Sequence, residues 1–232
     1  MPIRFAVAAL VACLAGAPCL AKEAMIGQTP VTLTPPSGQC ELDAGQPGDA
    51  RMLQTTETAL SGVGNRLLAF FADCKQLADW RTGKRPLLED FAQYQVAAAT
   101  VDAAPPPDTD DFIKQVCARQ RKEGERTLTS LATDIKTRIE EAVRGVTVNQ
   151  VRFMGVMAEE PGVCYAAMVQ RFRAETGKDV TIVGVYATLF VKGKLVHYYV
   201  YTPYRSAQTV TALLARHKLN VAALIAANKK AV

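Results

Sequence analysis

The segment 180–201, VTIVGVYATLFVKGKLVHYYVY, is the feature that most restricts the fold of this chain. Its apolar residues recur at alternate positions on both sides of Lys192 and Gly193, a pattern typical of a β-hairpin with a two-residue turn. If these two residues form the centre of the turn, Val191 pairs with Lys194. The rest of the register follows, because side chains alternate between the two faces of a strand. The segment therefore predicts two antiparallel strands.

The predicted register gives the hairpin two chemically different faces. One face is almost wholly aliphatic, and we expect it to lie on the core, under a long or a closing helix. The other face carries Tyr186, His197, Tyr199 and Tyr201. These rings are either covered by a second helix or the amino-terminal half, or they line a groove that binds a ligand or partner protein. They form the candidate binding surface.

The remaining elements are predicted from periodicity and from capping or turn residues. Asp49 is a candidate helix cap, Gly124 is expected to bend the longest helix, and Asn220 to mark a step in the last one. Segment 75–86, with a Thr-Gly pair and a proline, is predicted to be a polar turn. The predicted elements are a strand or hairpin within 31–43, a helix over 50–62, strands over 66–74 and 87–98, a helix over 109–143, strands from 146 and over 163–172, and a helix capped by Ser206.

This order predicts an α+β fold, with an antiparallel meandering sheet on which helices pack as in an α/β/α sandwich. Residues 22–104 form an amino-terminal half with a hairpin, a helix and two strands. Residues 105–232 form a carboxy-terminal half with the long helix, the antiparallel strands and the closing helix. Pro105, Pro106 and Pro107 stiffen the linker between the halves. We expect both halves to join in one compact domain.

Residues 1–21 have the composition of a signal peptide. Arg4 is the only charged residue before Lys22, and the 17 residues from Phe5 to Ala21 are uncharged and rich in small apolar side chains. This run is shorter than the roughly 20 residues that span a bilayer as a helix. We therefore expect export to a bacterial periplasm, with cleavage after Ala21.

A lipoprotein signal is the alternative, because the segment 10–13, LVAC, resembles a lipobox ending at Cys13. Only 12 residues would precede that cysteine, which is unusually few, so we expect no lipid anchor. No other segment has enough consecutive apolar residues to be predicted to cross a membrane. The mature chain is therefore expected to lack a transmembrane span.

Four cysteines remain after the predicted cleavage, and an even number in an oxidising compartment indicates disulfides. Four cysteines allow three pairings. We favour Cys40 with Cys74 and Cys117 with Cys164, because each pair then lies within one half of the chain. No two of them are close enough in sequence for a zinc knuckle, so we expect no metal site.

Catalytic signals are weak in this sequence. Of the two histidines, His217 lies in the closing helix and is interpreted as structural, which leaves His197 as the only candidate base. No nucleophile-elbow, P-loop or other cofactor signature accompanies it. The densest basic cluster, within 119–126, is interleaved with Glu123 and Glu125, which is typical of a solvated helix face and not of a nucleic-acid site.

Several segments resemble uncharacterised proteobacterial periplasmic proteins. They are LTPPSGQCELD, the helix after it, RLLAFFADC with the DWR turn, and YATLFVKGKLVHYYVYTPY. More distantly, the order of elements is similar to that of the PsbP-like family of α/β/α sandwiches. That resemblance implies a non-catalytic assembly or binding protein and carries over no site residue.

The sequence as a whole predicts a non-enzymatic periplasmic protein. It would bind an envelope protein or a small ligand through the aromatic hairpin face and act in envelope maintenance or assembly. The alternative is a hydrolase or transferase centred on His197, which would need an acidic residue and a nucleophile within hydrogen-bond reach of the ring.

Overall fold

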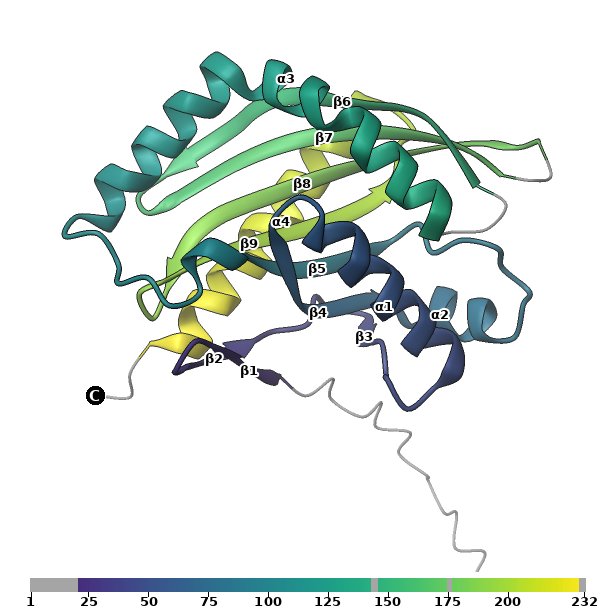
Figure 1. Cartoon of the computed structure of the whole chain (residues 1–232), viewed down its shortest axis with the longest axis horizontal. Helices are drawn as coiled ribbons and strands as arrows, with labels where there is room; N and C mark the ends of the chain where they lie inside the picture. The colour runs from purple at the N-terminus through teal and green to yellow at the C-terminus, as the bar shows by residue number, and fades with distance from the viewer. Residues whose placement is uncertain (1–20, 143–145, 175–176, 230–232) are drawn as a thin grey trace, which may run out of the picture.

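The computed structural model describes residues 21–142, 146–174 and 177–229; the predicted signal peptide lies outside this range, apart from Ala21. Its helices and strands follow the predicted α+β order (Figure 1). The strands are β1 Lys22–Ile26, β2 Thr29–Leu33, β3 Gln39–Glu41, β4 Asn65–Asp73, β5 Phe91–Ala97, β6 Val146–Glu160, β7 Val163–Ala174, β8 Asp179–Val191 and β9 Lys194–Pro203. The helices are α1 Pro47–Ser61, α2 Cys74–Arg81, α3 Thr109–Ala142 and α4 Ala207–Asn228, with a 3₁₀ turn at Ala98–Thr100.

A seven-stranded antiparallel sheet contains strands from both halves of the chain, in the order β3-β4-β5-β9-β8-β7-β6. The halves meet where β5 pairs with β9, with Phe91 opposite Tyr201 and Gln95 opposite His197. The predicted meander is therefore confirmed for β6 to β9, which follow one another in the sheet. The return of β9 to the side of β5 makes the sheet continuous across both halves.

Helices cover both faces of this sheet (Figure 1). Helix α4 packs against β8 and β9 on one face, while α1 packs on β4 and α3 on β6 over the other. The separate β1-β2 ribbon lies beside α4, where the Asn228 side chain hydrogen-bonds both the backbone N–H and the C=O of Thr32. The fold class predicted from the sequence is the one observed.

Helix α1 begins earlier than predicted, and Asp49 is not its cap. Gln46 is the N-cap residue, and Asp49 lies within the first turn with its side chain fully buried. Its carboxylate accepts hydrogen bonds from the Arg81 guanidinium and from the backbone N–H of Asp43. The acidic residue at a helix start therefore serves a tertiary contact with α2 instead of a local cap.

The segment predicted to be a polar turn contains helix α2. Its N-cap is Asp73, whose carboxylate accepts a hydrogen bond from the backbone N–H of Gln76 at 2.9 Å. The helix buries Leu77 and ends before Gly83, which has a positive φ of 74°. It has only eight residues, so its periodic signal is too short to detect beside the charged residues and the Thr-Gly pair.

Helix α3 is continuous over 34 residues and turns across the sheet about halfway along its length (Figure 1). Gly124, near its middle, is the site of a close approach: a Cβ atom there would lie 2.4 Å from the Phe153 ring of β6. Ile135 and Ile139, which continue the apolar pattern of the sequence in this helix, have side chains outside the described part of the chain. At the helix start, Ile113 and Cys117 are buried.

Helix α4 is also continuous, so the step predicted at Asn220 is absent. The backbone N–H of Ser206 donates to the Thr209 hydroxyl at 3.2 Å, in agreement with the predicted start of this helix. By length and composition alone α4 is long and apolar enough to cross a membrane, as a core helix can also be, so the absence of a transmembrane span stays a prediction. One side of α4 packs on the sheet through Val210, Leu213, Val221 and Leu224.

Both predicted disulfides are present. Cys40 bonds Cys74 and joins β3 to the start of α2, while Cys117 bonds Cys164 and joins α3 to β7. The second bond therefore connects a helix that covers the sheet to the sheet itself.

Candidate functional site

The hairpin register predicted from the sequence is confirmed. Val191 pairs with Lys194, and Lys192 and Gly193 have positive φ values of 49° and 77°. Two positive φ angles in succession are the geometry of a primed hairpin turn. The same register places Tyr186 opposite Tyr199 on neighbouring strands.

The aliphatic face of the hairpin is the core face, as predicted. Val183, Val185, Val196 and Val200 are fully buried in the cluster that also contains the apolar side of α4. The closing helix, and not the long one, therefore covers this face. The long helix α3 lies over the opposite, aromatic face of the sheet.

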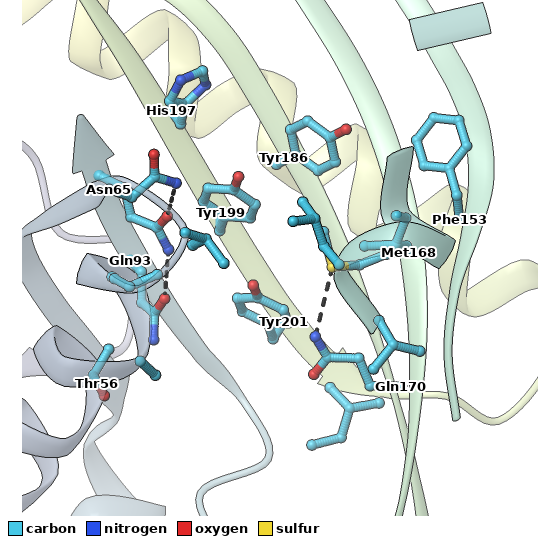
Figure 2. A pocket seen from close by; sticks show the side chains of 18 of the residues that line it. Thr56, Asn65, Gln93, Phe153, Met168, Gln170, Tyr186, His197, Tyr199 and Tyr201 are labelled. Atoms are coloured by element: carbon cyan, nitrogen blue, oxygen red, sulfur yellow. Dashed lines mark hydrogen bonds between the residues drawn. The ribbon is translucent and has the colours of Figure 1, made fainter. Parts of the chain in front are cut away.

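A cavity of about 560 Å³ is lined by the aromatic face of the sheet and by residues of the helices α1 and α3. Figure 2 shows side chains that line it, among them Tyr186, Tyr199 and Tyr201. All four candidate residues line it. The sheet contributes most of the floor from strands β5 to β9, and the helices contribute a roof of apolar and polar side chains, the polar ones including Thr56 and Thr127. That roof includes Ala59, Leu60, Leu128 and Leu131. Helices thus cover the aromatic face without filling the space above it.

The aromatic rings of the floor are stacked in a row. Tyr186 stacks on Tyr199 with ring centroids 5.0 Å apart, Tyr199 lies 6.2 Å from Tyr201, and Tyr201 stacks on Phe91 at 4.4 Å. Gly184, opposite Tyr201 on the next strand, leaves room for that ring: a Cβ atom at Gly184 would lie 2.6 Å from it. The row is therefore fixed by ring contacts and by one glycine.

The hydroxyl groups of Tyr186, Tyr199 and Tyr201 have no hydrogen-bond partner within the described residues, and Figure 2 draws no dashed line to them. Burial raises the pKa of each phenol, that of Tyr199 to about 12. All three are therefore uncharged at neutral pH and can both donate and accept a hydrogen bond.

A chain of side-chain amides on β4 and β5 borders the tyrosines. Asn65 donates to the side-chain oxygen of Gln95 at 3.1 Å, and Gln95 donates to the oxygen of Gln93 at 2.8 Å (Figure 2). The chain ends at the amide nitrogen of Gln93, for which the described residues supply no acceptor. Gln93 therefore adds a donor to the floor.

His197 lies beside this floor as a neutral imidazole. Its Nδ1 is 3.1 Å from the hydroxyl of buried Thr188, its cross-strand neighbour. Burial lowers the pKa of His197 to about 4. Among the described residues no carboxylate bonds the ring, so the acidic partner that the hydrolase or transferase alternative requires is missing from this arrangement.

Charge is confined to one side of the cavity. Arg119 and Glu123, both on α3, are the charged residues among the described lining, and Arg119 is exposed. Glu123 lies 3.5 Å from Arg126 on the same helix. Within the described residues, no group of three or more metal-binding side chains occurs. The floor therefore offers hydrogen bonds without a formal charge.

Sequence reasoning missed most of the cavity. The amides of β5 and the roof of α1 lie 100 or more positions before β9 in the chain, and only the fold brings them to it. Alternation in the segment 91–97, FAQYQVA, places Phe91, Gln93 and Gln95 on one face, a signal that was available before the structure.

Fold and site together define an α+β protein with a mostly apolar, partly hydroxylated cavity between its sheet and two helices. No family model, curated protein or solved structure matches the chain. The resemblance to periplasmic and PsbP-like proteins therefore stays a prediction.

Proposed function

We propose that this chain is a non-enzymatic periplasmic binding protein that holds a small ligand in the cavity between the aromatic hairpin face and helices α1 and α3. The observation that carries the proposal is the empty volume of about 560 Å³ directly over the predicted surface. Ligand pockets of proteins have volumes of roughly 300–1,000 Å³ and mostly apolar walls with a few polar groups.

A small ligand fits this site better than a partner protein. The candidate tyrosines are covered by helices, and Tyr201 is only 7% exposed. A flat protein interface would need these rings at the surface. An envelope protein would then be the partner that receives the ligand, and a role in envelope maintenance or assembly would consist in delivering it.

The proposed location depends on the export signal and on the disulfides. Two disulfides are typical of an oxidising compartment such as the periplasm. Mass spectrometry of the protein recovered from a periplasmic fraction should give a mature chain that begins at Lys22. Recovery of the full-length chain from the cytosol, or a lipid-modified Cys13, would contradict this.

Ligand binding can be tested with the neutral fluorophore N-phenyl-1-naphthylamine and the purified mature protein. We expect a saturable increase in fluorescence. Ala59→Trp and, as a second filling variant, Thr56→Trp should weaken binding at least about tenfold, because both positions line the cavity. Ala118→Trp, at an exposed position of α3, is the matched control and should bind as the native protein does.

Circular dichroism should show that all variants are folded. Absence of saturable binding to the native protein, or equal binding by folded filling and control variants, would overturn the proposal. The hydrolase or transferase alternative gains no support from His197, because its hydrogen bond goes to the fully buried Thr188.

A further inference from the structure

Three tyrosine hydroxyls and the amide of Gln93 line the floor of the cavity without a partner among the described residues. These groups lie along one side of the volume, while the helices α1 and α3 on the opposite side contribute apolar side chains, among them Leu60, Leu128 and Leu131, together with polar ones such as Thr56 and Thr127. The cavity therefore has a hydrogen-bonding floor and a roof with an apolar part, formed by Leu60, Leu128 and Leu131.

A plain hydrocarbon chain does not match this arrangement. It would displace water from the Tyr186, Tyr199 and Tyr201 hydroxyls without replacing the hydrogen bonds, and each polar group left unsatisfied lowers affinity. A molecule with oxygen atoms along one edge would satisfy these groups and still bury its apolar side against Leu60 and Leu128.

A charged ligand group does not match the floor either. Anions in proteins are held by cationic side chains or several backbone N–H groups, and the cation of the described lining is the exposed Arg119 at the side. The phenols and the neutral His197 ring supply no formal charge beneath the ligand. A carboxylate or phosphate placed on the floor would lose its hydration without an ionic partner.

We infer, on the basis of the proposed binding function, that the ligand is an uncharged, ring-containing molecule with ketone, ester or hydroxyl oxygens along one edge. Its oxygens accept hydrogen bonds from Tyr186, Tyr199 and Tyr201, and its apolar face packs under α1 and α3. Flat rings fit between the stacked aromatic floor and the leucines of the roof.

The test compares three probes with the same two-ring carbon skeleton. Menadione, a neutral naphthoquinone, carries two carbonyl oxygens that 2-methylnaphthalene lacks, and 2-naphthoate adds a negative charge. Each competes with N-phenyl-1-naphthylamine for the mature protein. We expect menadione to bind about tenfold or more tightly than 2-methylnaphthalene, and 2-naphthoate to bind most weakly.

Removal of single tyrosine hydroxyls tests whether the preference for menadione over 2-methylnaphthalene comes from the floor of the cavity. Tyr199→Phe and Tyr186→Phe keep the rings and should each weaken menadione binding by about three- to tenfold, with no loss for 2-methylnaphthalene. Tyr204→Phe, which changes an exposed tyrosine outside the cavity, is the control.

The outcomes separate the two proposals. If N-phenyl-1-naphthylamine does not bind the native protein, the binding function itself is wrong. If it binds but menadione has no advantage over 2-methylnaphthalene, or the tyrosine variants leave that advantage unchanged, the ligand class is wrong and the binding function stands.

Discussion

At the scale of single residues, the contact between α1 and α2 depends on the buried carboxyl group of Asp49. Asp49 is fully buried, yet its partner Arg81 is partly exposed, with 36% of its side chain accessible. Burial raises the pKa of the Asp49 carboxyl, but the hydrogen bonds from Arg81 and from the Asp43 N–H outweigh it and the net shift is downward. The carboxylate is therefore charged in the folded protein and depends on Arg81.

Arg81→Met should reveal this dependence. The substitution leaves a buried carboxylate with one hydrogen bond and should lower the free energy of unfolding by about 2–4 kcal/mol, measured by urea denaturation. Arg85→Met removes the partner of Glu89 in a more exposed pair and should change stability by less than about 1 kcal/mol. Equal effects of the two substitutions would contradict the argument.

The two histidines predict the response to acid. The Nε2–H of His217 donates to the Tyr198 carbonyl at 2.9 Å, its Nδ1 has no partner within the described residues, and burial lowers its pKa to about 3. His217 is therefore a neutral, buried residue, in agreement with its interpretation as structural. His197 is likewise neutral, with a pKa lowered to about 4.

Stability should fall on acidification below about pH 6.5, because the unfolded chain then binds protons that the folded chain excludes. The contribution of each histidine is fully present above that pH. It is lost at up to about 1.4 kcal/mol per pH unit as the pH approaches the folded values. Urea midpoints at pH 7 and pH 5 should differ less in His217→Gln than in the native protein. An unchanged difference would refute the assignment.

At the scale of elements, periodicity identified the long segments and failed on the short ones. The 22 residues of the hairpin and the 34 of α3 repeat their patterns often enough to identify type and face. Helix α2 is too short to repeat its pattern in this way. Asp49 was interpreted as a helix cap because its partner in the structure, Arg81, lies 32 residues further along the chain. The predicted change of direction in α3 agrees with its course over the sheet (Figure 1).

Gly124→Ala tests the contact between α3 and β6. Alanine normally stabilises a helix interior by about 1 kcal/mol relative to glycine. Here the added Cβ atom would lie 2.4 Å from the Phe153 ring, so we expect a net loss in thermal stability. The double variant Gly124→Ala/Phe153→Leu should recover part of it. A stabilising single substitution would mean that Phe153 moves aside without cost.

At the scale of the whole molecule, the sheet joins both halves of the chain and the Cys117–Cys164 bond holds α3 on it. The same helix forms part of the cavity roof. The bond therefore links the stability of the fold to the shape of the site. The Cys40–Cys74 bond joins elements away from the roof and provides a comparison.

Removal of either disulfide by paired serine substitutions should lower the free energy of unfolding by up to about 4 kcal/mol, since both close loops of similar length. The two pairs should differ in binding. Cys117→Ser/Cys164→Ser should weaken N-phenyl-1-naphthylamine binding at temperatures where the chain is still folded, and Cys40→Ser/Cys74→Ser should not. Equal affinities would show that the roof keeps its position without the bond.

The sequence by itself determined the α+β class, the hairpin register, its two faces and the two disulfide pairs. The class follows from the order of the predicted elements, the register and faces from the alternation of side chains about the Lys192-Gly193 turn, and the pairs from the position of two cysteines in each half. Only the tertiary structure decided that α4 covers the aliphatic face and that α1 and α3 leave a cavity over Tyr186, Tyr199 and Tyr201. The physical reason is the separation of the interacting residues along the sequence. Local patterns specify which side of an element is apolar, but contacts between segments far apart in the chain decide which element packs on that side.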